Sequence, residues 1–121
     1  MTKILIAEDQ ADLREMIAQS LRLSGYDVVT TEDGERAYQQ AKSIQPDLII
    51  LDYELPRLNG SQVCQKLRAM GSFSKTPVVI ISSYGNPFYM ETSMAAGAKA
   101  FIRKPFELDH LTEKVNALLS S

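Results

Sequence analysis

The chain has 121 residues, of which 45% are hydrophobic and 23% are charged, a composition typical of one globular domain. Its net charge of −2 argues against a nucleic-acid surface and against a polybasic membrane patch. The single cysteine, Cys64, excludes an internal disulfide and a cysteine metal cage. No apolar run approaches the roughly 18 residues of a membrane span, and the N-terminus lacks a signal-peptide pattern. We therefore expect a small cytoplasmic domain that occupies residues 1–121.

Strand-like and helix-like segments alternate in the first half of the chain. Short apolar or β-branched runs predict strands, and apolar residues at helical spacing predict the helices between them. Gly25 is predicted to end the first helix, and Asp33 to cap the second. The expected elements are strand Lys3–Ala7, helix Ala11–Leu23, strand Asp27–Thr31, a helix from Asp33 to Pro46, and strand Asp47–Asp52. The buried face of the first helix is expected to carry Leu13, Met16, Ile17 and Leu21.

The same alternation continues to the end of the chain. Ser61 is predicted to cap a third helix, and Pro87 suits the first position of a fourth helix that runs towards Gly97. The other expected elements are strand Val78–Ile81, strand Ala100–Arg103 and a closing helix with Leu108, Leu111, Val115 and Leu118 on one face. Five such βα units predict an α/β fold, a flavodoxin-like, doubly wound parallel sheet of strand order 2-1-3-4-5 with helices on both faces.

Acidic side chains follow two of the predicted strands. Glu8 and Asp9 come directly after the first strand, and Asp52 ends the third. In this strand order the first and third strands flank the switch point, where the carboxyl ends of the strands form the ligand crevice. Three carboxylates in one crevice repel each other unless a cation neutralises them. Oxygen ligands of this kind suit Mg²⁺, with Mn²⁺ as an alternative.

Two further side chains are expected at the same crevice. Ser82 ends the fourth strand, and Lys104 follows the fifth. A carboxylate such as Asp52 can attack phosphorus and form an acyl phosphate. A lysine cation and a serine hydroxyl can then bind the phosphoryl oxygens, where negative charge accumulates. The residues therefore indicate phosphoryl chemistry.

With these motifs the chain resembles the receiver domain of two-component response regulators, chemotaxis-regulator-like in form, over nearly all of Lys3 to Leu119. The matching motifs are Glu8-Asp9, Asp52 with Pro56 and Gly60, Ser82, Gly97-Ala98 and Lys104-Pro105-Phe106. The resemblance implies that Asp52 is the phosphoacceptor, which takes a phosphoryl group from the phosphohistidine of a histidine kinase or phosphotransfer protein. It also implies a signalling switch that catalyses only its own phosphorylation and dephosphorylation.

The resemblance implies roles around Asp52 as well. Asp9, Asp52 and the backbone carbonyl of Glu54 would bind Mg²⁺, with Glu8 acting mostly through water. Lys104 would pair with the phosphoryl oxygens, and its peptide bond to Pro105 would be cis.

The resemblance further implies a switch. Ser82 would turn its hydroxyl onto the phosphoryl group, and Phe101 would fill the vacated space. The face formed by the fourth helix, fifth strand and fifth helix would then change, with Tyr84, Tyr89 and Lys99 contributing to it. Glu54 and Tyr84 stand where they could set the lifetime of the phosphoryl group. Family patterns more often have threonine and tyrosine in place of Ser82 and Phe101.

The implied partners are the cognate kinase and a downstream protein or fused output domain. Kinase docking would involve the first helix around Ala11, Arg14 and Glu15. The domain itself would contact neither nucleic acid nor membrane, and it would be a monomer or a weak dimer linked to phosphorylation. The sequence leaves open whether it is free-standing, a phosphorelay intermediate or part of a larger protein.

Four alternatives were compared with this interpretation. A haloacid-dehalogenase-like phosphatase needs a second aspartate two positions after the nucleophile, where this chain has Glu54. A flavodoxin-like FMN carrier would have its phosphate repelled by Glu8-Asp9. A P-loop NTPase is excluded because no glycine-rich run with Lys-Ser or Lys-Thr is present. A docking module that works without phosphorylation would be marked by a missing site residue, and none is missing.

Overall fold

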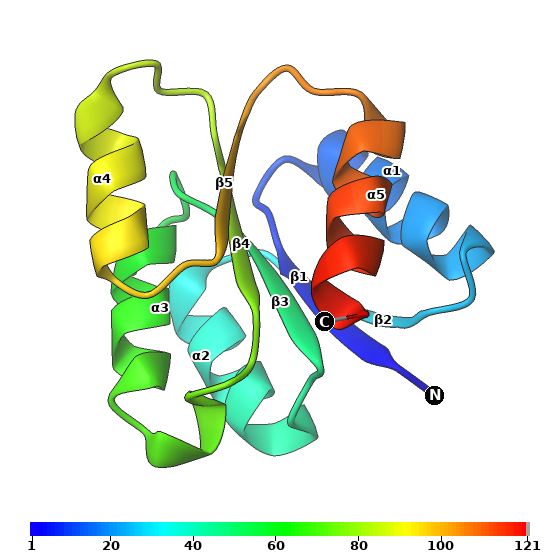
Figure 1. The fold of residues 1–121 in the computed structure, drawn as a ribbon, viewed down its shortest axis with the longest axis horizontal. Helices are drawn as coiled ribbons and strands as arrows, with labels where there is room; N and C mark the ends of the chain where they lie inside the picture. The colour runs from blue at the N-terminus through cyan, green and yellow to red at the C-terminus, as the bar shows by residue number, and fades with distance from the viewer. Residues whose placement is uncertain (121) are drawn as a thin grey trace.

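The structure is a computed structural model and describes residues 1–120. Its elements follow the predicted alternation of strands and helices (Figure 1). In chain order they are β1 (Lys3–Ala7), α1 (Ala11–Leu23), β2 (Asp27–Thr31), α2 (Gly34–Ile44), β3 (Leu48–Asp52), α3 (Gly60–Arg68), a 3₁₀ turn (Gly71–Phe73), β4 (Val78–Ser82), α4 (Pro87–Ala95), β5 (Ala100–Arg103) and α5 (Leu108–Leu119).

The strands form one parallel sheet in the order β2-β1-β3-β4-β5, which confirms the predicted topology. The register decides which residues meet at its carboxyl edge. Ala7 of β1 pairs with Leu51 of β3, so Glu8 and Asp52 leave these neighbouring strands at the same level. Ser82 pairs with Arg103, so Lys104 leaves β5 just beyond the end of β4. The sheet therefore brings the predicted site residues to one edge.

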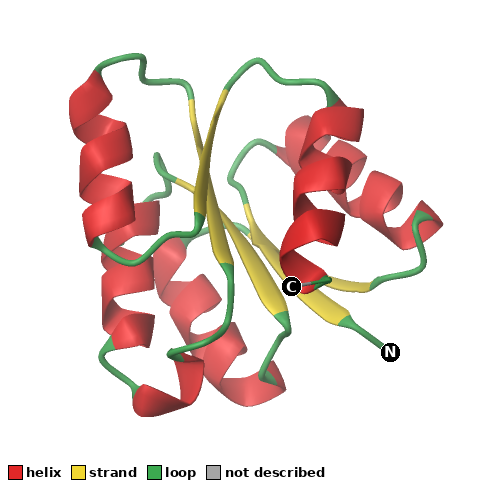
Figure 2. Ribbon diagram, in the orientation of Figure 1, coloured by secondary structure: helices red, strands yellow, loops and turns green. Residues whose placement is uncertain are grey.

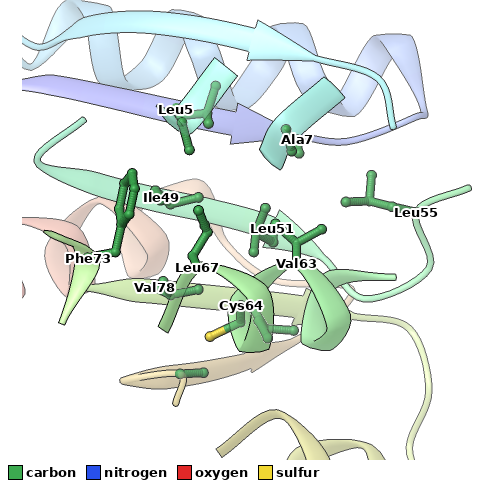
Figure 3. Close-up of a cluster of buried hydrophobic side chains, with 14 of the residues drawn as sticks. Leu5, Ala7, Ile49, Leu51, Leu55, Val63, Cys64, Leu67, Phe73 and Val78 are labelled. Atoms are coloured by element: carbon green, nitrogen blue, oxygen red, sulfur yellow. The ribbon is translucent and has the colours of Figure 1, made fainter. Parts of the chain in front are cut away.

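The helices cover both faces of the sheet (Figure 2). Alternate strand residues point to opposite faces, so each strand contributes to two apolar layers. Ile4, Ile6 and Ile50 pack with α1 and α5, whereas Leu5 and Ile49 pack on the side of α2 and α3. Figure 3 shows the second layer, where Leu67 of α3 and Phe73 lie against β3 and β4. Burial of these side chains from both sides holds the sheet edge, and hence the site, in place.

Several predicted helix ends agree with the structure. Asp33 caps α2, and its side chain accepts a hydrogen bond from the backbone N–H of Arg36 at 2.7 Å. Gly25 follows the end of α1 with a φ of 97°, in the left-handed region that favours glycine. The end of α2 before Pro46 is also as expected, with Gln45 in the left-handed conformation.

Two local predictions were wrong. Ser61 does not cap α3: Asn59 does, in a capping box with Gln62, and Ser61 lies buried within the helix. Met16 is not on the buried face of α1 but is 52% exposed. Ala18 is buried instead, beside Ile17 and Leu21, so the buried face of α1 includes Ala18 rather than Met16. The 3₁₀ turn was not predicted.

Candidate functional site

Asp52 lies at the centre of the carboxyl edge of the sheet. It ends β3, the central strand of the sheet, and only 1% of its surface is exposed. Its Oδ2 accepts a hydrogen bond from Nζ of Lys104 at 2.7 Å, and its Oδ1 accepts one from the backbone N–H of Glu54 at 3.0 Å. Both oxygens are therefore held in a fixed orientation by groups from two different loops.

Glu8 is a buried carboxylate without a full set of partners. It is 0% exposed, and its Oε2 accepts a hydrogen bond from the backbone N–H of Gln10 at 3.0 Å. Its Oε1 lies 3.1 Å from Nζ of Lys104 but accepts no hydrogen bond from any residue in 1–120. Burial, together with the neighbouring Asp52, raises the pKa of Glu8 to about 7. An incompletely satisfied buried oxygen of this kind is a suitable ligand for a cation.

Glu8, Asp9 and Asp52 form one acidic cluster. One carboxylate oxygen from each lies within 4.8 Å of the others, and Asp9 is the exposed member. Lys104 is the cation that pairs with this cluster, through both Glu8 and Asp52. A small, hard, divalent cation with oxygen ligands fits such a cluster, since it balances charge that one lysine leaves uncompensated.

Lys104 is held by the carboxylates that it neutralises. Its side chain is 14% exposed. Burial alone would lower its pKa, but the hydrogen bond and charge of Asp52, followed by those of Glu8, outweigh burial and raise the pKa. The Lys104–Pro105 peptide bond is cis, the geometry that the family resemblance implies. The ammonium group therefore stays charged and directed into the crevice.

Glu54 makes contacts that the sequence did not reveal. Its carboxylate accepts hydrogen bonds from the hydroxyls of Ser82 and Ser83, each at 2.6 Å, and from the backbone N–H of Ser83 at 3.0 Å. Burial raises the pKa of Glu54, but these bonds, aided by the charge of Lys104, outweigh burial and lower it overall. Glu54 is thus an ionised carboxylate that connects the ends of β3 and β4.

A group of aromatic rings lies beside this network. The ring centroid of Tyr84 is 4.4 Å from that of Tyr89 and 6.3 Å from that of Tyr53, and Phe88 packs edge-on against Tyr89. Tyr84 remains 45% exposed. Tyr84 and Tyr89 were predicted to contribute to the face formed by α4, β5 and α5, whereas the packing of the Tyr53 ring against them was missed. The signal available in the sequence was an aromatic residue directly after Asp52.

A small polar crevice opens at the site. It is lined by Asp9, Gln10, Asp52, Glu54, Ser83, Tyr84 and Lys104. The structure thus brings together most of the predicted site residues. Phe101 is the exception, because it lies within β5, half-buried, and packs against the apolar layer on the side of α2 and α3. Lys99 is exposed just before β5.

Gly60 allows α3 to begin close to Asp52. A Cβ atom at this position would lie 2.6 Å from the backbone oxygen of Asp52 and 3.1 Å from Cα of Tyr53. Contacts this short are not tolerated, so a larger residue would displace the end of β3. This explains, in physical terms, the glycine that the sequence carries eight residues after Asp52.

The helices described in residues 1–120 include none that is long and apolar enough to cross a bilayer.

Comparison with known proteins agrees with this geometry. A family model described as the response regulator receiver domain matches residues 4–116. The chain is 34% identical over 117 residues to the alkaline phosphatase synthesis transcriptional regulatory protein PhoP of Bacillus subtilis, covering 97% of this chain and 48% of that protein. It is 36% identical over 119 residues to the response regulator ArlR of Staphylococcus aureus, covering 98% of this chain and 53% of that protein. The chain thus spans about half the length of these curated relatives.

A solved structure extends the likeness to the fold. The chemotaxis response regulator CheY4 of Vibrio cholerae superposes with a TM-score of 0.91 at 27% identity, with 98% of each chain covered. The sheet order, the acidic cluster and the family match lead to one conclusion. The chain belongs to the response regulator receiver domain family of two-component signal transduction.

Proposed function

We propose that Asp52 is the phosphoacceptor of this receiver domain, with residues 1–121 acting as one unit. The observation that carries the proposal is the position of its carboxylate, which is buried at the carboxyl edge of the sheet, bonded to Lys104 and next to Glu8 and Asp9. A carboxylate held in this way is oriented to attack a phosphorus atom that enters the crevice.

The proposed reaction is a phosphoryl transfer from a phosphohistidine. An Asp52 carboxylate oxygen forms the new O–P bond, the N–P bond breaks, and the electron pair stays on the histidine nitrogen. Lys104 pairs with the phosphoryl oxygens, and Ser82 donates its hydroxyl to one of them. Hydrolysis by water later returns Asp52 to its carboxylate, so the domain turns over no outside substrate.

The site residues fit Mg²⁺, or Mn²⁺ in its place. Asp9, Asp52 and the backbone carbonyl of Glu54 would bind the ion, and Glu8, whose Oε1 accepts no hydrogen bond from residues 1–120, would act mostly through water. When bound, the ion supplies positive charge that offsets the phosphoryl oxygens and the clustered carboxylates. Lys104 supplies the remaining positive charge from the protein itself.

The proposed output is a change in the face formed by α4, β5 and α5. Movement of Ser82 towards the phosphoryl group would draw in the loop before α4, and Phe101 would take up the vacated space. That face would then control a downstream protein or a fused output domain, while the kinase docks beside α1. We place the domain in the cytoplasm, as a monomer or a weak phosphorylation-linked dimer.

We further propose that Glu54 and Tyr84 set the lifetime of the phosphoryl group. Both line the crevice through which hydrolytic water would reach Asp52. Separate alanine substitutions should change the dephosphorylation rate, and unchanged rates in both variants would contradict the role.

The direct test is the intact mass after incubation with acetyl phosphate, with and without Mg²⁺. The proposal predicts a metal-dependent gain of one phosphoryl group in the wild type and none in Asp52→Asn. No gain, with a phosphorylated kinase also failing as donor, would contradict it and favour a docking module that works without phosphorylation.

A further inference from the structure

The side chain of Glu54 joins two loops at the carboxyl edge of the sheet. Its Oε2 accepts a hydrogen bond from Oγ of Ser82 at 2.6 Å. Its Oε1 accepts two from Ser83, from Oγ at 2.6 Å and from the backbone N–H at 3.0 Å. Hydroxyl bonds of this length to a carboxylate are typical of strong, charge-assisted pairs. Glu54 therefore ties the end of β4 to the loop that follows β3.

The hydroxyl of Ser82 is fully engaged in this arrangement. A serine carries one O–H donor, and here that donor is directed at Glu54. Its oxygen accepts the backbone N–H of Tyr84 at 3.0 Å, and the residue is fully buried. Under the proposed function Ser82 donates to a phosphoryl oxygen on Asp52. It can do so only after its bond to Glu54 is broken.

The charge of a phosphorylated Asp52 would act against the same bonds. The backbone N–H of Glu54 donates to Oδ1 of Asp52 at 3.0 Å, and both side chains line one crevice. A phosphoryl group brings about two negative charges and three strong acceptor oxygens. It would repel the Glu54 carboxylate and compete for the proton of Ser82.

We propose that Glu54 is a positioning residue that latches Ser82 and Ser83 in the unphosphorylated state, and that phosphorylation of Asp52 moves the Ser82 hydrogen bond from Glu54 to the phosphoryl group. This inference rests on the proposed function of Asp52. It gives the Glu54 side chain a role distinct from metal binding by its backbone and from the rate of hydrolysis. Weakening the latch should make the switched state easier to reach.

The test is a titration with beryllofluoride, a phosphoryl mimic that binds carboxylates, in excess Mg²⁺. Binding is followed by the backbone amide NMR signals of Ser82 to Tyr89. The variants are Glu54→Ala, Ser83→Ala and the double substitution, with Glu113→Ala as a control for the loss of an exposed glutamate elsewhere, on α5. Ser83→Ala removes one bond of the latch and keeps the charge of Glu54, so it separates latching from electrostatic repulsion.

The latch predicts tighter beryllofluoride binding in both single variants, by about tenfold or more for Glu54→Ala and about threefold or more for Ser83→Ala. Ser83→Ala should add nothing in the Glu54→Ala background, because its partner is already absent. Glu113→Ala should bind like the wild type.

Two results would overturn the latch while leaving Asp52 as the acceptor: unchanged or weaker binding by Ser83→Ala, or fully additive effects in the double variant. A wild type that shows no Mg²⁺-dependent response to beryllofluoride, like Asp52→Asn, would instead overturn the proposed function and the latch with it.

Discussion

The ammonium group of Lys104 donates a hydrogen bond to Oδ2 of Asp52 at 2.7 Å, which joins the segment after β5 to the end of β3. The same nitrogen lies 3.1 Å from Oε1 of Glu8. One partly buried cation thus compensates two buried carboxylates that the fold brings together. The single positive charge of Lys104 offsets only part of the negative charge of these carboxylates, so the site can bind a further cation.

Replacement of Lys104 by methionine should destabilise the metal-free protein. The change leaves two buried carboxylates without their cation, and breaking a buried ion pair in this way costs about 3 kcal/mol or more. Urea unfolding in a chelator measures the loss, with Lys99→Met as a control because Lys99 is an exposed lysine near the same strand. Equal stability losses in the two variants would show that the Lys104 contacts contribute nothing specific.

Glu8 should make the stability of the metal-free protein depend on pH. Its folded-state pKa of about 7 lies above its ordinary value of 4.5, so the folded protein binds more protons than the unfolded chain between these values. The free energy of unfolding should therefore fall as pH rises through that range and level off above it. The contribution of Glu8 to this fall should be roughly 3 kcal/mol at most.

The difference between the wild type and Glu8→Gln isolates this effect in urea titrations at several pH values. The variant should show a flatter profile between pH 4.5 and 7, the two pKa limits. Asp52→Asn should lower the pKa of Glu8, because Asp52 helps to raise it. Parallel profiles for the wild type and Glu8→Gln would contradict the assignment.

Mg²⁺ should stabilise the protein through the acidic cluster. At ten times its dissociation constant the ion would add about 1.4 kcal/mol to the free energy of unfolding. Asp9→Asn should remove most of this gain, since Asp9 is the exposed member of the cluster. Asp12→Asn is the matched control, because Asp12 is an exposed aspartate in the first turn of α1 outside the cluster. Thermal unfolding at increasing Mg²⁺ measures both, and an Asp9→Asn response equal to that of Asp12→Asn would argue against the metal site.

Gly60→Ala should displace the end of β3 and so disturb the position of Asp52. The added Cβ would meet the backbone of Asp52 and Tyr53, so the protein should lose about 1–3 kcal/mol of stability and the acceptor should shift. Gly71→Ala is the control, because a Cβ there would have no neighbour within 4 Å. Urea unfolding and the acetyl phosphate reaction should both distinguish the two variants, and similar behaviour would show that the close approach at Gly60 does not matter.

The strand order and the meeting of Glu8, Asp9 and Asp52 could be predicted from sequence, because buried parallel strands read as short apolar runs and their carboxyl ends share one edge. The capping residue of α3 and the buried face of α1 were harder to predict. Asn59 and Ser61 are both good capping residues, and only the actual start of α3 distinguishes them. Met16 and Ala18 stand on either side of Ile17, and the orientation of α1 against the sheet decides which of them is buried.

The contacts of Glu54 could not be predicted at all. They depend on the rotamer of one side chain and on the distance between two loops, which no periodicity encodes. The same holds for the ring packing of Tyr53, Tyr84 and Tyr89. The residues that meet at the candidate site were therefore visible in the sequence, whereas the contacts that hold them in place required the structure.

The most direct test of the account is to locate the phosphoryl group. Protein phosphorylated by acetyl phosphate in Mg²⁺ is treated with borohydride, which reduces an acyl phosphate to an alcohol and so converts a phosphorylated aspartate into homoserine. Peptide sequencing by mass spectrometry then reads the modified position. The account predicts homoserine at position 52 alone; homoserine at position 9, reduction of Glu8 or Glu54, or a phosphate found on Ser82, would contradict it.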